Sequence, residues 1–146
     1  KKDKGEYQIT NALENMTAKG KKLQAGKVGE WLDCGNKNAT VYTNQRVLEI
    51  KKSNYKSPSS VKQMHAVVIE HCSIGENVEI NHSIVGPHVS IGANTKVDNS
   101  VIQNSIIQAH SNISNACISI SMIGNYVNVN RAAEDLSIGD YSASDE

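Results

Sequence analysis

An apolar residue recurs at every fifth or sixth position through the second half of this 146-residue chain. Three successive steps sum to 17 residues early in the segment and to 16 residues later. Because the pattern closes after three steps, it predicts a three-sided coil, and stacked coils about 4.8 Å apart share one core. Residues 68–129 hold three to four such coils. The recurring positions are Val68, Ile74, Ile80, Val85, Ile91, Val97, Ile102, Ile107, Ile113, Ile118, Ile123 and Val129.

A second set of positions has the same period. We call each recurring apolar position a start. Four residues after each start, most residues are small or β-branched, and we expect them to face inward in a narrow prism. These positions are Cys72, Val78, Ile84, Val89, Thr95, Val101, Ile106, Ser111, Cys117, Met122 and Val127. Asparagines fall two or three residues after a start, at expected corners, because Asn tolerates a positive φ. They are Asn77, Asn94, Asn99, Asn104, Asn115 and Asn125.

The composition of this segment also favours strands. Residues 65–130 contain twelve Ile and nine Val but neither Leu nor Phe. Such β-branched side chains fit a pleated surface well. A sandwich of unrelated strands is the alternative, but its strands would not keep a five-or-six step over eleven intervals.

Two stretches of the segment resemble a known repeat. Ile74–Ile80 (IGENVEI) and Ile91–Val97 (IGANTKV) are similar to the hexapeptide repeat of left-handed β-helices. The resemblance implies a mainly β fold in which residues 65–130 form a left-handed parallel β-helix of three to four coils. The left hand is implied by the resemblance alone, since the general crossover rule favours the right hand.

Two helices are expected before this segment. Asn11 and Glu14 have the spacing of a capping box in a short amphipathic pattern that Gly20 would end. Asn36 is expected to cap a second helix that runs to about Ile50.

The remaining segments complete the predicted organisation. Leu23–Leu32 is expected to form one or two strands, so residues 1–50 have α/β character. Fifty residues with so few strands cannot cover a sheet, which indicates the end of a larger domain. Residues 51–64 contain four Lys, four Ser and no acid, and are expected to be a linker. Residues 131–146 form an acidic tail that we expect to cap the last coil.

Two motifs in the first half resemble an enzyme family. Gly5–Thr10 (GEYQIT) and, about twenty residues later, Trp31–Gly35 (WLDCG) are similar to the closing segment of sugar-1-phosphate nucleotidyltransferases. The likeness is greatest to glucose-1-phosphate thymidylyltransferases of the long form, in which a hexapeptide β-helix follows these motifs. Asn11 and Cys34 depart from the family, which has aspartate and threonine there. Tyr7 and Gln8 replace other pairs seen in relatives, so the identity of the sugar stays open.

The resemblance implies a reaction and a set of site residues. A sugar-1-phosphate oxygen attacks the α-phosphorus of a nucleoside triphosphate and pyrophosphate leaves, with Mg²⁺ to neutralise the phosphates. In that family the motif aspartate holds the metal, which corresponds to Asp33, and positions matching Glu6, Thr10 and Trp31 line the sugar site. The glycine-rich nucleotide loop is absent from these residues. We therefore expect the C-terminal piece of a longer enzyme, inactive alone.

Each of these residues also has an ordinary structural interpretation. Asp33 is then a turn residue, Trp31 a core aromatic, and Glu6 a charge that complements a helix start. The three cysteines, Cys34, Cys72 and Cys117, are expected to be buried small hydrophobes.

The histidines leave a second enzyme class open, because hexapeptide acyltransferases use a histidine base. His71 and His88, 17 residues apart, should stack on one edge, whereas His82 and His110 lie elsewhere. The even spacing of the repeat leaves no room for the long loop that such enzymes usually extrude. We therefore expect solvated corner histidines.

The net charge and the cysteine content limit the expected classes of partner and the expected compartment. Fifteen basic and fifteen acidic residues give no net charge, which argues against nucleic acid or an anionic membrane as partner. Three widely spaced cysteines favour a reducing cytoplasm over a disulfide scaffold. The expected partners are sugar-1-phosphate and nucleoside triphosphate in the full-length protein. A second copy is also expected, because outward residues such as Ile69 and Ile120 offer a surface for self-association through the β-helix.

Overall fold

The computed structural model describes residues 2–3, 6–51, 58–132 and 140. The chain divides between Trp31 and Leu32 into two compact units. None of the described helices is both long and apolar enough to cross a membrane. The predicted acidic tail, residues 131–146, lies almost wholly outside the described residues.

The first unit contains a two-stranded antiparallel sheet and one helix. β1 (Lys2–Asp3) pairs with β2 (Glu6–Tyr7), and α1 (Ile9–Ala18) follows. The predicted capping box is wrong, because Asn11 lies inside α1 and Gln8 precedes it without a side-chain cap. Gly20, with φ of +75°, follows the end of the helix as expected.

The strands predicted for Leu23–Leu32 are also wrong. These residues have no regular secondary structure. Gly26 and Gly29 weaken a strand, and none of the described strands pairs with this segment.

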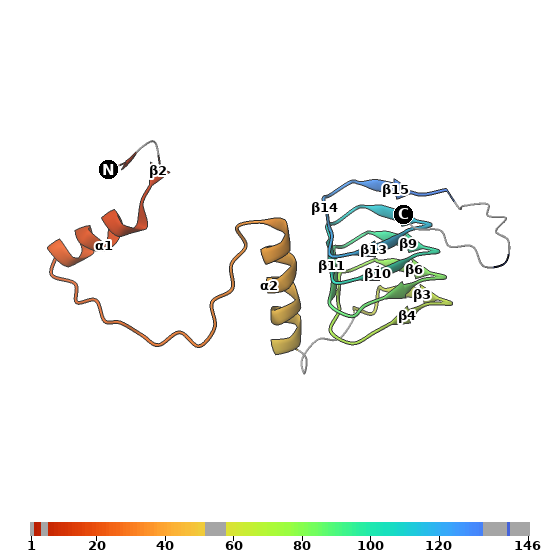
Figure 1. Cartoon of the computed structure of the whole chain (residues 1–146), viewed down its shortest axis with the longest axis horizontal. Helices are drawn as coiled ribbons and strands as arrows, with labels where there is room; N and C mark the ends of the chain where they lie inside the picture. The colour runs from red at the N-terminus through yellow and green to blue at the C-terminus, as the bar shows by residue number, and fades with distance from the viewer. Residues whose placement is uncertain (1, 4–5, 52–57, 133–139, 141–146) are drawn as a thin grey trace. The chain divides into compact units, whose positions relative to one another are not determined.

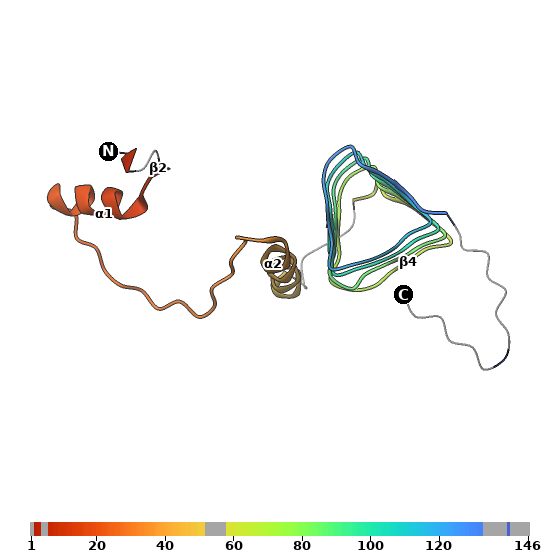
Figure 2. The same ribbon diagram turned by 45° about the horizontal axis from the view of Figure 1, so that its top comes forward.

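The second unit is a three-sided parallel β-helix of about four coils, as the repeat predicts (Figures 1 and 2). Viewed obliquely along the stack, the coils superpose as nested triangles (Figure 2). The left hand stays a prediction from the resemblance.

Each side of the prism is one parallel sheet, which we name by its surface. The apolar face contains β4 (Val67–Val68), β7 (Ile84–Val85), β10 (Val101–Gln103) and β13 (Cys117–Ser119). The helix face contains β5 (Ser73–Ile74), β8 (Val89–Ile91), β11 (Ser105–Ile107) and β14 (Met122–Ile123). The charged face contains β3 (Lys62–Met64), β6 (Glu79–Asn81), β9 (Lys96–Asp98), β12 (Asn112–Ser114) and β15 (Asn128–Asn130).

The recurring apolar residues form the core. On the charged face, Ile80, Val97, Ile113 and Val129 pair in register on successive coils. Of these, the first three are fully buried, and Val129 is half-buried in the last described coil. Each coil therefore covers the apolar edge of its neighbour.

The second inward position is only partly as predicted. Where the step is six residues, the residue four after a start is buried or half-buried: Cys72, Val78, Val89, Thr95, Ser111 and Val127. Where the step is five residues, the residue four after a start is exposed, or half-buried in the case of Ile106. These residues are Ile84, Val101, Ile106, Cys117 and Met122. The inward-facing residue always lies two positions before the following start. In the shorter steps Ser83, Ser100, Ser105 and Ala116 occupy this position and are buried.

The corners are built from residues with a positive φ, each three residues before a start. These residues are His65, His71, Asn77, His82, His88, Asn94, Asn99, Asn104, His110, Asn115, Ile120 and Tyr126. Five of the six predicted asparagines are among them, and Tyr126 replaces Asn125. A positive φ is costly for most residues but less so for Asn and His.

Side chains at equivalent corners stack on one another along the prism. The amide of Asn99 donates to the Oδ1 of Asn115 at 2.7 Å, and that of Asn115 donates to the Oδ1 of Asn130, at the end of β15, at 2.9 Å. The rings of His71 and His88 stack with their centroids 5.4 Å apart, as their spacing predicts. These contacts help to hold corner residues in a conformation that they would otherwise avoid.

Step length varies at one corner only. Between the apolar and helix faces the step is six residues in the first two coils, Val68 to Ile74 and Val85 to Ile91. It is five in the next two coils, from Ile102 and from Ile118.

Helix α2 (Lys37–Ile50) belongs to the same unit as the prism. Its N-cap is as predicted, since the Oδ1 of Asn36 accepts from the N–H of Ala39 at 2.9 Å. The helix packs on β8 and β11 and buries Val41 and Leu48. The prism begins at β3, inside the segment expected to be a linker, because Lys62–Met64 pairs with β6.

The cysteine prediction holds for one residue of three. All three cysteines are free, but only Cys72 is buried, whereas Cys34 and Cys117 are exposed. Burial raises the pKa of the Cys72 thiol.

The inward and outward positions can be separated by one substitution made at each. Ile91 is 3% exposed and Ile84 is 42% exposed. Ile91→Asp should lower the free energy of unfolding by more than about 4 kcal/mol, because it buries an unpaired charge. Ile84→Asp should cost about 1 kcal/mol. Equal denaturation midpoints for the two variants would contradict the inward assignment.

An ion-pair ladder on the charged face predicts a pH dependence. Lys62 and Lys96 contact the Glu79 carboxylate at 3.2 and 3.3 Å. The hydrogen bond from Lys62, followed by that from Lys96, holds the pKa of Glu79 below its ordinary value of 4.5. A carboxyl with a lowered pKa stabilises the fold at neutral pH, and this stabilisation disappears as the pH falls through the folded-state pKa.

Glu79→Gln should therefore make the melting temperature fall less steeply between about pH 5 and pH 3. The matched control is Glu76→Gln, at an exposed residue for which the structure describes no ion pair. A thermal series in which Glu79→Gln follows the parent curve would show that the ladder contributes nothing.

Candidate functional site

The Trp31–Gly35 motif ends in a tight turn that leads into α2. The Oδ1 of Asp33 accepts hydrogen bonds from the N–H groups of Cys34 at 2.7 Å and Gly35 at 3.1 Å. Asp33 is exposed, and its Oδ2 accepts no hydrogen bond from the part of the chain that the structure describes. The turn therefore orients the carboxylate and leaves one oxygen for another ligand.

Gly35 lies close to this carboxylate. A Cβ at residue 35 would lie 3.1 Å from the Oδ2 of Asp33. That is a tight contact, so a side chain at residue 35 would shift the carboxylate by a few tenths of an ångström. The Asp-x-Gly pattern thus has a local physical reason.

Two threonines of α2 hold the backbone of this turn. The hydroxyl of Thr43 donates to the carbonyl oxygen of Asp33 at 2.6 Å. The hydroxyl of Thr40 contacts the carbonyl oxygen of Cys34 at 3.2 Å and that of Asn36 at 2.8 Å. The chain before Asn36 is therefore folded back along the first turns of α2.

The chemistry of Asp33 suits one ligand of a hard cation. An exposed, ionisable carboxylate with an open oxygen is what Mg²⁺ prefers. No cluster of three or more His, Cys, Asp or Glu side chains that could hold a metal occurs among the described residues. Asp33 thus fits as one contributor to a site, as the resemblance implies, and the described part of the chain does not complete that site.

The other three predicted residues lie in the first unit. Glu6 is in β2, and its side chain is outside the described set. Thr10 is the second residue of α1 and is exposed. Trp31 is 82% exposed, so it is not a core aromatic within the described chain. Their roles in a sugar site stay predictions.

Sequence reasoning missed the contacts that fasten α2 to the prism. The Oγ of Ser90 donates to the Oδ1 of Asn44 at 2.6 Å. The Nε2 of His88 lies 3.2 Å from the Oε1 of Glu49, and the Nζ of Lys37 donates to the carbonyl oxygen of Ile120 at 2.8 Å. These pairs join residues 39 to 83 positions apart, so no local pattern could have found them.

Glu49 has several polar partners at this junction. The hydrogen bond from Gln45 is the largest cause that holds the pKa of Glu49 below its ordinary value, and Arg46 and His88 add to it. A groove of about 420 Å³ beside these residues is lined by Asn38, Val41, Tyr42, Gln45, Pro87, His88, Asn104 and Ile120.

His88 is not placed to act as the general base of an acyl transfer. The ring of His88 is 15% exposed, with one nitrogen near Glu49 and the other 3.3 Å from the Oδ1 of Asn104. Both nitrogens are engaged, whereas a general base must have one free to accept a proton from a substrate.

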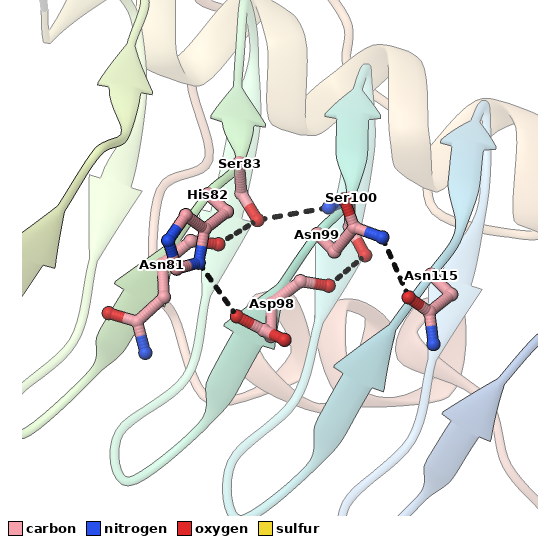
Figure 3. A network of polar contacts seen from close by, with 7 residues as sticks. All are labelled: Asn81, His82, Ser83, Asp98, Asn99, Ser100 and Asn115. Atoms are coloured by element: carbon pink, nitrogen blue, oxygen red, sulfur yellow. Dashed lines mark hydrogen bonds and ion pairs between the residues drawn. The ribbon is translucent and has the colours of Figure 1, made fainter.

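His82 has a more open position, at the corner between the charged and apolar faces. Its Nδ1 lies 3.5 Å from the Oδ1 of Asp98, as Figure 3 shows. A shallow groove of about 370 Å³ runs past it and is lined also by Asn99, Asn115 and Cys117. In Figure 3 the neighbouring polar groups bond one another along the corner, as Asn99 does to Asn115.

No protein-family model matches the chain, and no curated protein sequence matches it.

The N-cap offers a test of the helix that carries the Asp33 turn. Asn36→Ala should cost about 1 kcal/mol of unfolding free energy, because the N–H of Ala39 loses its acceptor. Asn38→Ala, at an exposed residue two positions later, should be neutral or slightly stabilising because Ala favours the helix. Equal chemical denaturation midpoints would contradict the capping role.

Proposed function

We propose that the chain is the C-terminal part of a sugar-1-phosphate nucleotidyltransferase similar to glucose-1-phosphate thymidylyltransferases. One observation carries the proposal: a hexapeptide β-helix follows the two family motifs in the family's order, and Asp33 of the second motif has an exposed, oriented carboxylate. The nucleotide and the sugar stay open. A reducing cytoplasm is the proposed compartment, and three free cysteines agree with it.

Each residue has a defined part in this proposal. Asp33 supplies one carboxylate oxygen to Mg²⁺, and Glu6, Thr10 and Trp31 bind the sugar. When bound, Mg²⁺ neutralises the phosphates and aligns them for attack on the α-phosphorus. In this proposal the nucleotide loop and a second carboxylate come from other residues of the full-length enzyme, and we expect no turnover from residues 1–146 alone.

The proposal is tested with Asp33→Asn in the full-length protein. Asn keeps an acceptor for the two N–H groups of the turn but has no charge, so the fold should be retained. We expect kcat/KM with Mg²⁺ to fall by about 100-fold or more, since a metal contributes several kcal/mol to the transition state.

The control is Asp98→Asn, which removes a carboxylate from the prism without touching the turn. Its pyrophosphate release should equal that of the parent protein. Unchanged turnover in Asp33→Asn would refute the metal assignment, and an inactive full-length protein would refute the proposed reaction.

A second candidate is an assembly module, and it rests on the apolar face. The outward residues Val67, Ile84, Val101 and Cys117 pair in register on successive coils and are all exposed. Helix α2 packs on β8 and β11 of the helix face and the charged face presents Lys and Glu, whereas this row offers an exposed apolar surface for a partner. A second copy presents ridges with the same spacing, which favours a homo-oligomer.

Sedimentation of the chain tests this candidate. The parent should be oligomeric, and the double variant Ile84→Lys with Val101→Lys should shift it towards monomer by placing charges in the contact. Asn112→Lys, outward on the charged face, is the control and should leave the oligomer intact. A parent chain that sediments as a monomer would remove the assembly role.

A further inference from the structure

Helix α2 is fastened to the prism at three points along its length. Lys37 in its first turn bonds the carbonyl oxygen of Ile120, Asn44 in its middle bonds Ser90, and Glu49 near its end contacts His88. Ile120 lies two coils after His88 at the same corner, so the helix runs along the stack, as Figure 1 shows. Val41 and Leu48 are buried between these polar contacts.

The same helix holds the Asp33 turn. Thr43 lies next to Asn44 in sequence, and its hydroxyl reaches back to the carbonyl oxygen of Asp33 at 2.6 Å. Thr40, one turn earlier, reaches the carbonyl oxygen of Cys34. Thus adjacent residues of α2 bond the prism on one side and the turn on the other.

These contacts form one continuous connection. It runs from Ser90 on β8 through Asn44 and Thr43 to the backbone of Asp33, and ends at the carboxylate that Cys34 and Gly35 orient. A ligand carboxylate must be held within about half an ångström for good binding, and loss of a supporting contact typically weakens metal binding about 10- to 100-fold.

We propose that Thr43 is a positioning residue for the Asp33 carboxylate and that the β-helix, through Ser90 and α2, holds this residue in place. The inference rests on the proposed function, because it takes Asp33 as a metal ligand. The β-helix then has a role in the site itself, separate from any role in assembly.

The test measures binding of Mn²⁺, a spectroscopic substitute for Mg²⁺, to the full-length protein by electron paramagnetic resonance. Thr43→Val removes the hydroxyl at nearly constant volume and should weaken Mn²⁺ binding about 10- to 100-fold, as other outer contacts of metal ligands do. Thr43→Ser keeps the hydroxyl and should restore binding to within about threefold of the parent.

The connection to the prism has its own matched pair. Ser90→Ala should weaken Mn²⁺ binding about threefold or more, since it frees Asn44. Ser73→Ala is the control, because Ser73 pairs with Ser90 one coil earlier on the same face and has no described bond to α2. Equal effects of Ser90→Ala and Ser73→Ala would refute the role of the prism.

The outcomes separate this inference from the proposed function. If Asp33→Asn leaves Mn²⁺ binding unchanged, the metal assignment itself fails. If Asp33→Asn abolishes binding while Thr43→Val binds as the parent does, only the positioning role is refuted. A Thr43→Val protein that melts at a lower temperature but keeps its Mn²⁺ affinity shows a structural hydrogen bond and also refutes that role.

Discussion

The rest of this structure depends on the stacking of each coil on the next. Ile80, Val97 and Ile113 are fully buried only because equivalent residues lie above and below them in register. The backbone bonds follow the same rule, as the N–H of Val101 donates to the carbonyl oxygen of Ala116 on the next coil at 2.9 Å. In the last described coil Ile123 and Val129 are only half-buried, since no described coil follows them. Stability is thus a nearest-neighbour property of the stack.

The prism could be predicted from the sequence because its geometry is periodic in the sequence itself. The start positions indicate the three sides and the number of coils directly. The sequence predicts the inward residues less well. Counting forward from one start places Ile84 and Val101 inside, whereas the chain fixes the inward position relative to the next start, where Ser83 and Ser100 lie.

The candidate site could be predicted only in part. Asn36 caps the helix and Asp33 forms the turn through hydrogen bonds to residues at most three positions away, so both follow from local spacing. The bonds from α2 to Ser90 and His88 join segments that share no period, and packing alone brings them together. In Leu23–Leu32 the sequence instead predicts too much structure. Its apolar residues favour a strand, but none of the described strands pairs with this segment.

The corner between the apolar and helix faces loses one residue after the second coil. A stack with identical corners would offer a helix the same backbone path at every level. Pro87 and His88 lie before the shortening, whereas Asn104 and Ile120 lie after it, and all four line the groove beside α2. The shorter step therefore makes the levels of the stack unequal beside α2, which favours one register of the helix together with its bonds to Ser90 and Ile120.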